Sequence, residues 1–294
     1  MERPKRFAIW ANTGKNAFWE LLPELLSWAE SCGIEAYLTT RIIKFWDGKD
    51  QFNYNIIESA DDFSKMNFIL ALGGDGTIIG TARNIGKRNI PILGIHLGDL
   101  GFLANVTKDD LYTRLNQVAS GDYHVESRRV LSGKIIKDGH EQIYSALNDI
   151  VINPSSSHRM ISCVVKANGR LLGRYKADGI IVSSPTGSTA YSLAAGGPIV
   201  VPDVESIILT PICPHTLTSR PVVVSINTEL EITFPEESSE VGLSVDGQIH
   251  AVLTPDTKVI VKNGDFSIPF IQFSDTDYFH MLRTKMGWGK RGDG

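Results

Sequence analysis

Apolar residues near the start of the chain form two short continuous runs with a helix-spaced set between them. The runs at 7–11 and 34–39 have the length of buried strands. A helix is predicted after Asn16, ending at Gly33, with Pro23 indicating either a kink or a late start. Its apolar face comprises Leu22, Leu25, Leu26 and Ala29. This strand-helix-strand order predicts a parallel sheet.

The next apolar run, 68–72, leads into the glycine-rich turn GGDGT at 73–77. Apolar residues at helical spacing follow, so the turn should leave a buried strand and open a helix. Another strand is predicted at 92–95. The stretch 96–103 contains two closely spaced glycines, Gly98 and Gly101, and we interpret it as a hinge between domains or as a wall of a binding cleft. Thr107 opens a capping-box pattern that predicts a further helix.

The pattern changes after residue 122, where short alternating segments rich in β-formers are separated by turn residues. These segments are 129–136, 142–152, 161–167, 230–234, 241–245 and 258–261. They predict an all-β domain of two packed sheets. We therefore expect an α/β domain with a parallel sheet over 1–122, an all-β sandwich domain over 123–275, and a helical tail over 276–294 that packs back on the first domain.

Composition narrows the class of protein. The 294 residues are 42% hydrophobic and 21% charged, with a net charge of −4, which is typical of a globular protein and gives no basic footprint for nucleic acid. No apolar run approaches the length of a membrane span and no signal-peptide core is present, so we expect a cytoplasmic protein without membrane contact. Cys32, Cys163 and Cys213 lack metal-site or disulfide spacing and are expected to be reduced core thiols.

The turn at 73–77 carries the first candidate chemistry. Its glycines let the backbone approach a ligand, and the N–H groups of the following helix turn favour an anion. Asp75 would repel a phosphate unless it accepts a hydrogen bond from a hydroxyl that attacks one. The alternative is an ordinary strand-to-helix turn in which Asp75 is only a helix cap.

The pair Gly14-Lys15 follows the first predicted strand and suggests a phosphate-binding P-loop. That motif needs a glycine five residues before Gly14, where Ile9 stands, and a serine or threonine after the lysine, where Asn16 stands. The sequence therefore does not predict a P-loop.

Two stretches of the second half combine buried strands with clustered polar residues. Asn148-Asp149 interrupts a β-rich apolar run, so the pair must find partners or face a cleft, unless it marks a strand-end turn. The segment 178–192 runs from an apolar strand into a turn dense in Gly, Ser and Thr, with small residues beyond it that leave room for a planar ligand. An exposed linker is the alternative, and the preceding apolar strand argues against it.

These motifs carry a family resemblance. The turn at 73–77 resembles a signature shared by NAD kinases, diacylglycerol and sphingoid lipid kinases and, more distantly, phosphofructokinases. The run 178–192 is similar to the NAD kinase pattern D-G-x-x-x-x-x-P-T-G-S-T-A-Y-S, and Asn148-Asp149 matches the Asn followed by Glu or Asp of that family. The resemblance extends over about 68–250.

The resemblance implies transfer of the γ-phosphoryl group of ATP to the 2′-hydroxyl of the adenosine ribose of NAD, with Asp75 as proton acceptor. It further implies a homodimer or homotetramer. ATP as donor implies Mg²⁺, and because the sequence shows no dedicated carboxylate cage, we expect no metal ligands of the protein's own and no tightly bound prosthetic group. A lipid kinase and a non-catalytic dinucleotide sensor are the alternatives. Phosphate would be bound by Gly73, Gly74, Gly76 and Thr77, and NAD by Asp75, Gly76, Asn148, Asp149, Arg159, Lys176, Asp178, Thr189, Ala190, Tyr191, Ser192, Leu193, Ala194 and Gln248.

Overall fold

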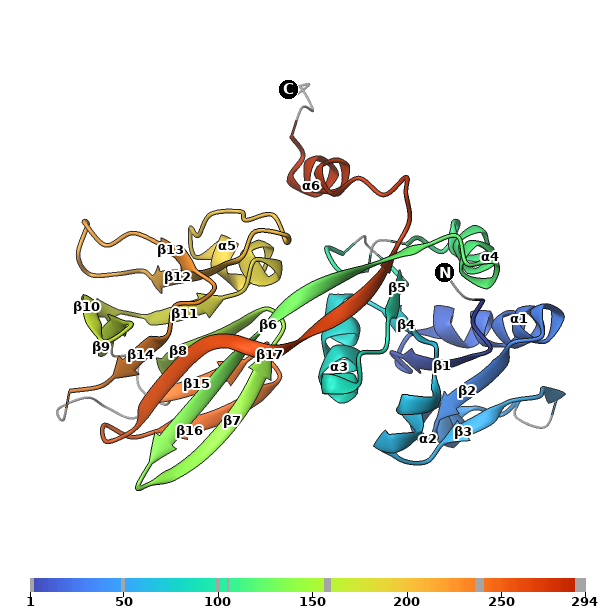
Figure 1. The fold of residues 1–294 in the computed structure, drawn as a ribbon, viewed down its shortest axis with the longest axis horizontal. Helices are drawn as coiled ribbons and strands as arrows, with labels where there is room; N and C mark the ends of the chain where they lie inside the picture. Colours follow the sequence, from blue (N-terminus) through green and yellow to red (C-terminus); the bar gives the residue numbers. More distant parts are fainter. Residues whose placement is uncertain are drawn as a thin grey trace. The chain divides into compact units, whose positions relative to one another are not determined.

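The computed structural model describes residues 3–48, 51–98, 101–104, 106–155, 160–235 and 241–288. The chain divides into two compact units (Figure 1). Unit 1 comprises Met1–Ser127 and Ile268–Gly294, and unit 2 comprises Arg128–Ser267. The sequence-based boundary at 275/276 differs from this division, because the end of the last strand pairs with a strand of unit 1.

Unit 1 is built on a parallel sheet in the order β5-β4-β1-β2-β3. Phe270, near the end of β17, pairs in parallel with Ile92 of β5. The strands are β1 (Arg6–Ala11), β2 (Glu35–Thr39), β3 (Asn55–Ile57), β4 (Phe68–Gly73), β5 (Ile92–His96) and β17 (Lys258–Gln272). The chain moves outward from β1 to β2 and β3, and then returns to the other side of β1 for β4 and β5. The strand order therefore reverses between β1 and β4, which is where open α/β sheets bind ligands.

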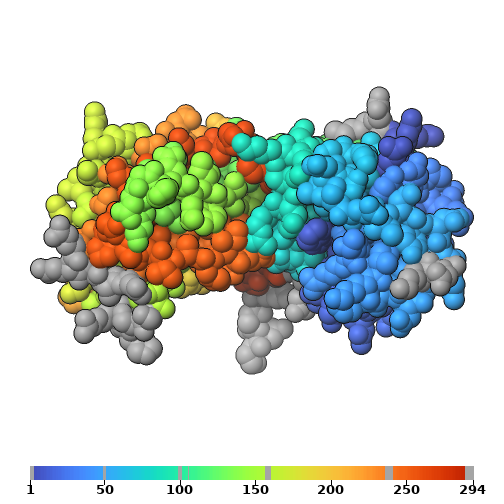
Figure 2. All heavy atoms as spheres, turned by 90° about the horizontal axis from the view of Figure 1, so that it is seen from below, coloured from blue at the N-terminus to red at the C-terminus, as the bar shows by residue number. Residues whose placement is uncertain are grey.

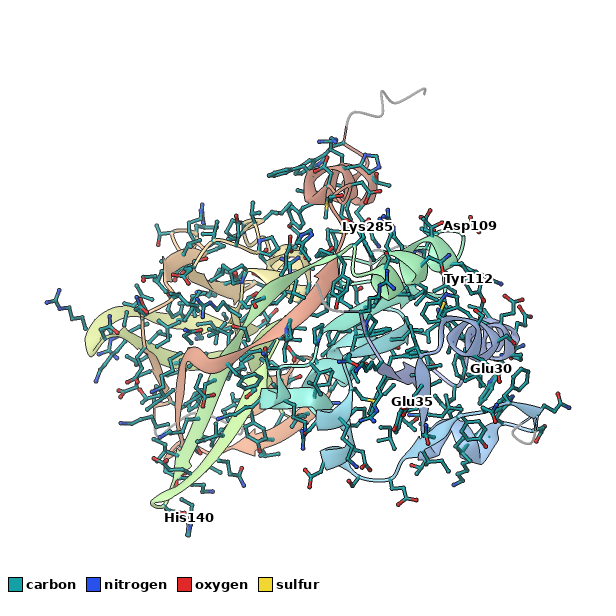
Figure 3. The ribbon with its side chains drawn as sticks, turned by 45° about the vertical axis from the view of Figure 1, so that its right-hand side comes forward. Glu30, Glu35, Asp109, Tyr112, His140 and Lys285 are labelled. Carbon is teal, nitrogen blue, oxygen red and sulfur yellow. The ribbon has the colours of Figure 1, made fainter. Side chains whose placement is uncertain are left out.

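Two helices cover one face of this sheet. Residues of α1 and α4 share a buried core with Phe7, Leu70 and Leu93. The hydroxyl of Tyr112 on α4 donates to Glu24 of α1 at 2.9 Å (Figure 3 labels Tyr112). The helices of unit 1 are α1 (Asn16–Cys32), α2 (Thr40–Phe45), α3 (Asp75–Ile85), α4 (Leu111–Ser120) and α6 (Tyr278–Met286), with 3-10 helices η2 (Ala60–Lys65) and η3 (Gly86–Arg88).

The predicted helix signals are placed as follows. Gly33 ends α1 in the left-handed conformation with φ 66°, as its sequence position predicts. Pro23 lies inside α1, which begins at Asn16, so the late start that we considered is wrong. The hydroxyl of Thr107 accepts from the backbone N–H of Asp110 at 3.1 Å, but α4 begins at Leu111 and its N-cap residue is Asp110, which makes no side-chain cap hydrogen bond. The predicted helix is therefore present, and the capping box at its start is not.

Unit 2 consists of two antiparallel sheets, as predicted. One has the order β10-β9-β14-β17, with β6 pairing with β17 and β7 pairing with β6, and the other has the order β13-β12-β11-β8-β15-β16. Inward-facing residues of both sheets, such as Val165 and Ile180, form one buried core. The strands are β6 (His124–Lys137), β7 (His140–Ala146), β8 (Asp149–Pro154), β9 (Ile161–Ala167), β10 (Arg170–Ala177), β11 (Gly179–Ser183), β12 (Ser206–Ile212), β13 (Val222–Ser225), β14 (Leu230–Thr233), β15 (Val241–Val245) and β16 (Ile249–Leu253), with η4 (Thr186–Thr189) and α5 (Tyr191–Ala194).

Several surface features complete the fold. In Figure 2, β6 and β7 (green) and β17 (orange) cover one face of unit 2. The ammonium of Lys285 on α6 lies 5.7 Å from the ring centre of Phe102, within unit 1 (Figure 3 labels Lys285). None of the helices in the described ranges is long and apolar enough to cross a membrane. All three cysteines are free thiols, but Cys32 and Cys213 are exposed, so only Cys163 is the expected core thiol.

Candidate functional site

The turn at 73–77 joins β4 to α3, as predicted. Gly73 is buried at the end of β4, and a Cβ atom there would lie 2.2 Å from the hydroxyl of Thr77. Gly74 occupies the position before the helix, and its carbonyl accepts from the backbone N–H of Thr77 at 2.9 Å. Glycine at position 73 is therefore required by the close approach of the first helical turn.

Asp75 begins α3, and its carboxylate points to the glycine-rich stretch after β5. Its Oδ2 accepts from the backbone N–H of Phe102 at 2.9 Å, and its Oδ1 accepts from those of Leu103 and Ala104 at 3.1 and 3.2 Å. A Cβ atom at Gly101 would lie 1.9 Å from Oδ1. Among the described residues no side chain caps this end of α3, so the helix-cap alternative is wrong, and Asp75 instead binds the loop 101–104 to the phosphate turn.

The hydrogen bonds from the loop leave the Asp75 carboxylate one acceptor position for a ligand. A carboxylate offers about four lone-pair positions on two oxygens. Two N–H groups of the described loop occupy Oδ1, and one, from Phe102, occupies Oδ2. Oδ2 therefore retains an acceptor position, and the loop fixes the orientation of the carboxylate that presents it.

A cavity of about 510 Å³ lies at the carboxyl ends of β1 and β4, where the strand order reverses. Three cationic side chains line it, from Lys15, Arg41 and Arg83, and its lining within the described ranges includes no carboxylate. The remaining lining residues are Trp10, Ala11, Asn12, Gly74, Gly76, Thr77, Gly80 and Asn84. A site with three cations and several exposed polar groups is suited to a polyphosphate.

Sequence reasoning missed most of this cavity. The Gly14-Lys15 pair is a local signal, but it does not match the P-loop pattern. Lys15 nevertheless lines the cavity, although the turn that carries it is not a P-loop. Its ammonium donates to the carbonyl of Leu97 at 3.3 Å. Arg41 and Arg83 come from α2 and α3, and nothing in their local sequence marks them as partners of the 73–77 turn.

In unit 2, the Asn148-Asp149 pair is held by Asp246. The carboxylate of Asp246 accepts from three successive backbone N–H groups, those of Leu147, Asn148 and Asp149, at 2.9, 2.7 and 3.0 Å. Both Asp246 and Gly247 have positive φ, 51° and 64°, and form a type I′ turn between β15 and β16. Asp246 therefore fixes the backbone of residues 147–149 from a turn about a hundred residues further along the chain.

The Asn148 backbone also packs against the turn that follows β11. Its carbonyl accepts from the N–H of Ser184 at 2.8 Å, and a Cβ atom at Gly187 would lie 2.2 Å from the same oxygen. Ser183, Ser184, Thr186 and Ser188 are all buried, so the exposed-linker alternative is wrong. The side-chain oxygen of Asn148 is buried without a hydrogen-bond partner among the described residues. The fold thus brings two of the predicted stretches together at one place.

The residues 189–194 divide by exposure. Tyr191 is 45% exposed and Ala194 is exposed, so both are accessible to a ligand. Thr189, Ala190 and Leu193 are partly buried. The Ser192 hydroxyl instead lies in the interior, 2.9 Å from the hydroxyl of Thr210, and supports the helix α5 rather than facing solvent.

Lys176 and Asp178 lie away from the Asn148 pair. Ser183 pairs with Asp149 at one end of β11, whereas Asp178 precedes the other end and is exposed, as is Lys176. Five residues of strand separate the two levels by roughly 16 Å. Gln248 follows the β15–β16 turn and is also exposed. Arg159 lies outside the described residues.

Comparisons with known proteins identify the family. The family model described as the ATP-NAD kinase N-terminal domain matches residues 7–123, and the ATP-NAD kinase C-terminal domain matches residues 147–273. This chain belongs to the NAD kinase family. It is 38% identical over 291 residues to the NAD kinase of Citrifermentans bemidjiense, covering 98% of this chain and 100% of that protein, and 38% identical over 288 residues, with the same coverage, to that of Geobacter sulfurreducens.

Solved structures of the NAD kinase family share the fold. The structure of yeast NADH kinase complexed with NADH superimposes with a TM-score of 0.90 at 24% identity, covering 99% of this chain and 90% of that one. An NAD kinase from Archaeoglobus fulgidus in complex with ATP gives a TM-score of 0.75 at 23% identity, covering 96% and 97%. The two-domain architecture of the family is therefore present here, including the C-terminal helix α6.

Among the predicted site residues of this NAD kinase family member, Asp149 has the pKa that its surroundings shift most clearly. It is 5% exposed, and burial, followed by the nearby Asp246 carboxylate, raises the pKa of Asp149 from 3.8 to about 7. Between about pH 4 and pH 7 the folded protein therefore holds a proton on Asp149 that the unfolded chain releases. The stability that this proton contributes is fully present below about pH 4 and is lost as the pH rises through about 7.

We therefore expect the free energy of unfolding to fall more steeply between pH 5 and pH 7 in the parent than in Asp149→Asn. The slope should differ by up to about 1.4 kcal/mol per pH unit, because the amide that replaces the carboxyl group cannot bind a proton. Urea unfolding of both proteins at several pH values measures the two slopes. Parallel slopes would show that Asp149 is already ionised in the folded protein at pH 5.

Proposed function

We propose that this chain transfers the γ-phosphoryl group of ATP to the 2′-hydroxyl of the adenosine ribose of NAD, giving NADP and ADP. The observation that supports this most is in unit 1, where the fixed carboxylate of Asp75 begins the helix whose Gly76, Thr77 and Arg83 line the three-cation cavity. Three backbone N–H groups of the loop 101–104 hold this carboxylate in place, and Oδ2 keeps one acceptor position for a ligand. A hydroxyl that attacks a phosphate does need an acceptor for its proton.

Positioning and charge neutralisation would do most of the catalysis. Phosphoryl transfer passes through a loose transition state with charge spread over the phosphoryl oxygens. Lys15, Arg41 and Arg83 would balance that charge, while Gly74, Gly76 and Thr77 hold phosphate oxygens. Asp75 would orient the 2′-hydroxyl through Oδ2 and take its proton as the oxygen–phosphorus bond forms.

In unit 2 we propose an acceptor site for NAD around the Asn148-Asp149 pair. The side-chain oxygen of Asn148, which is buried and has no hydrogen-bond partner among the described residues, suits an amino or hydroxyl donor of the ligand. Tyr191 and Ala194 are exposed on α5 and are assigned to the dinucleotide. The other assigned NAD residues are Arg159, Lys176, Asp178, Thr189, Ala190, Ser192, Leu193 and Gln248, the Ser192 side chain acting by support.

Mg²⁺ would enter as part of the Mg-ATP substrate. No group of three or more His, Cys, Asp or Glu side chains within the described ranges could hold a metal ion. The cavity lining offers neutral oxygens from Asn12, Thr77 and Asn84 and three positive charges, which does not fit a dedicated cation site. Phosphate oxygens and water are the ligands that Mg²⁺ commonly keeps, so the residues here need only bind its complex with ATP.

The reaction is tested by incubating the purified protein with Mg-ATP and either NAD or diacylglycerol and identifying the product by mass spectrometry. We expect NADP from the first pair and no phosphorylated lipid from the second. Phosphatidic acid would support the lipid-kinase alternative, and no product with either acceptor would support the dinucleotide sensor. Replacing ATP by polyphosphate in the same assay determines the phosphoryl donor.

The cavity assignment predicts an effect on the donor alone. Lys15→Ala should raise the KM for ATP about ten- to a hundredfold, because a charged hydrogen bond contributes about 1.5–3 kcal/mol, and should leave the KM for NAD nearly unchanged. Lys44→Ala is the matched control, since Lys44 carries the same charge on α2 but lies outside the cavity lining. Equal increases in both KM values for Lys15→Ala would contradict a role confined to the donor phosphates.

We also propose a place in NADP biosynthesis and a homodimer or homotetramer, which the family resemblance implies, and a cytoplasmic location, which rests on the composition of the sequence. Light scattering coupled to size-exclusion chromatography measures the assembly. A monomer at micromolar concentration would rule out the proposed homo-oligomer.

A further inference from the structure

A second pocket of about 220 Å³ adjoins the three-cation cavity in unit 1. The two share Trp10, Ala11 and Arg41, so they are continuous along the end of β1. We propose that this pocket binds the nucleobase of the phosphoryl donor. The proposal rests on the proposed function, since it assumes that the cavity holds the donor's phosphates.

The two spaces differ in chemistry in the way that the parts of a nucleotide differ. Within the described ranges the cavity has three cations and no acid in its lining, whereas the pocket has one cation, Arg41, and one acid, Glu58. Trp10 and Phe63 line the pocket, with ring centres 6.0 Å apart and planes tilted by 46°. A neutral, aromatic-lined pocket does not attract a phosphate, but it does provide a surface on which a base can stack.

Polar groups are also available at the pocket to pair with the edge of a base. The side chains of Thr39, Thr40 and Glu58 line it and make no hydrogen bond to the described residues. Two hydroxyls and a carboxylate can donate to and accept from the ring nitrogens and exocyclic groups of a base. A ligand pocket that is mostly apolar with a few such groups is the usual form of a specific small-molecule site.

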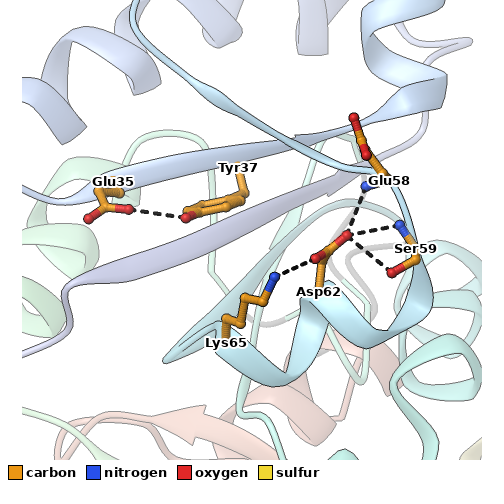
Figure 4. Close-up of polar contacts among 6 residues, drawn as sticks. All are labelled: Glu35, Tyr37, Glu58, Ser59, Asp62 and Lys65. Carbon is orange, nitrogen blue, oxygen red and sulfur yellow. Dashed lines mark hydrogen bonds and ion pairs between the residues drawn. The ribbon is translucent and has the colours of Figure 1, made fainter.

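The wall opposite β1 is fixed in place by a capping box (Figure 4). Asp62 Oδ2 accepts from the backbone N–H groups of Glu58 and Ser59 and from the Ser59 hydroxyl, at 3.2, 3.0 and 3.2 Å. Asp62 Oδ1 accepts from Lys65 at 2.7 Å. The segment Glu58 to Ala60 is therefore ordered before a ligand arrives, which lowers the entropic cost of binding a base there.

Binding of the base in this pocket would increase the affinity for ATP, whereas an inorganic polyphosphate has no base and gains no affinity there. Base stacking on aromatic side chains is strong enough to change affinity by about ten- to a hundredfold. Ala60 lines the pocket at the start of η2 and is exposed, so a larger side chain at this position should fill the pocket without disturbing the buried core. Ala60→Phe therefore tests the pocket, and Ala60→Ser, which adds a single oxygen, is the matched control.

The experiment measures binding of Mg-ATP and of Mg-tripolyphosphate to the parent and both variants by titration calorimetry, without NAD. We expect Ala60→Phe to raise the Kd for ATP at least tenfold and the Kd for tripolyphosphate by less than twofold, and Ala60→Ser to change neither. Parallel losses for both ligands, or an unchanged Kd for ATP in Ala60→Phe, would overturn the proposal. Because no turnover is measured, failure of the base pocket is distinguishable from failure of the proposed function, which is absence of NADP in the parent's assay.

Discussion

Asp75→Asn should reduce kcat for NAD phosphorylation by roughly two to four orders of magnitude, the usual contribution of general acid–base catalysis. Asparagine keeps the size of the side chain but cannot accept the hydroxyl proton. The structure adds a second consequence. Both carboxylate oxygens accept backbone N–H groups from the loop 101–104, so the amide nitrogen of asparagine would face at least one donor. The variant therefore loses the proton acceptor and part of the loop attachment together.

The two contributions can be separated. Gly101→Ala would press a methyl group against Oδ1, displacing the loop while the carboxylate keeps its chemistry. Its loss of kcat should be smaller than that of Asp75→Asn if proton transfer dominates. Asp109→Asn is the matched control, because Asp109 is an exposed carboxylate just before α4 (labelled in Figure 3). An Asp75→Asn enzyme that folds, binds NAD and turns over within threefold of the parent would remove Asp75 from the mechanism.

Local signals in the sequence predicted the elements well because each depends on neighbouring residues. The apolar run before the 73–77 turn and the glycine that ends α1 both have short-range causes. The change from helical to alternating spacing likewise separated the α/β part from the two-sheet part. The helix starts at Asn16, as predicted, and only the late start suggested by Pro23 is wrong, because Pro23 fits within the helix once tertiary contacts bury Leu22 and Leu25.

The sequence could not show the contacts that the fold makes between segments far apart in the chain. Asp75 and the loop at 101–104 are separated by a helix and a strand, and Asp246 is about a hundred residues from the backbone that it holds. The three cations of the cavity come from three different helices or their ends. No local sequence pattern marks these residues, because their role depends on which elements lie next to one another in the folded sheet.

Gly187→Ala should lower kcat/KM for NAD about a hundredfold and reduce the free energy of unfolding by about 1–3 kcal/mol. A Cβ atom at this position would lie 2.2 Å from the carbonyl oxygen of Asn148, 2.5 Å from its carbonyl carbon and 2.6 Å from its Cα. All three are backbone atoms of Asn148, whose N–H group is also held by Asp246. To relieve the steric clash, either the turn that carries Gly187 or the Asn148-Asp149 pair must shift by roughly 1 Å. Either movement misplaces residues assigned to NAD.

Gly242→Ala provides the matched control for this substitution. Gly242 lies in β15, which pairs with β8. The atom nearest to a Cβ added there would be the side-chain oxygen of Asn153 at 3.3 Å, and the next atoms lie at 3.6 Å or more. We expect little loss of stability there, and a KM for NAD close to that of the parent. Urea unfolding and steady-state kinetics on both variants give the comparison. If Gly187→Ala lost stability while its kcat/KM for NAD stayed within threefold of the parent, the contact between the turn and Asn148 would serve folding alone, and the acceptor site would have to lie elsewhere in unit 2.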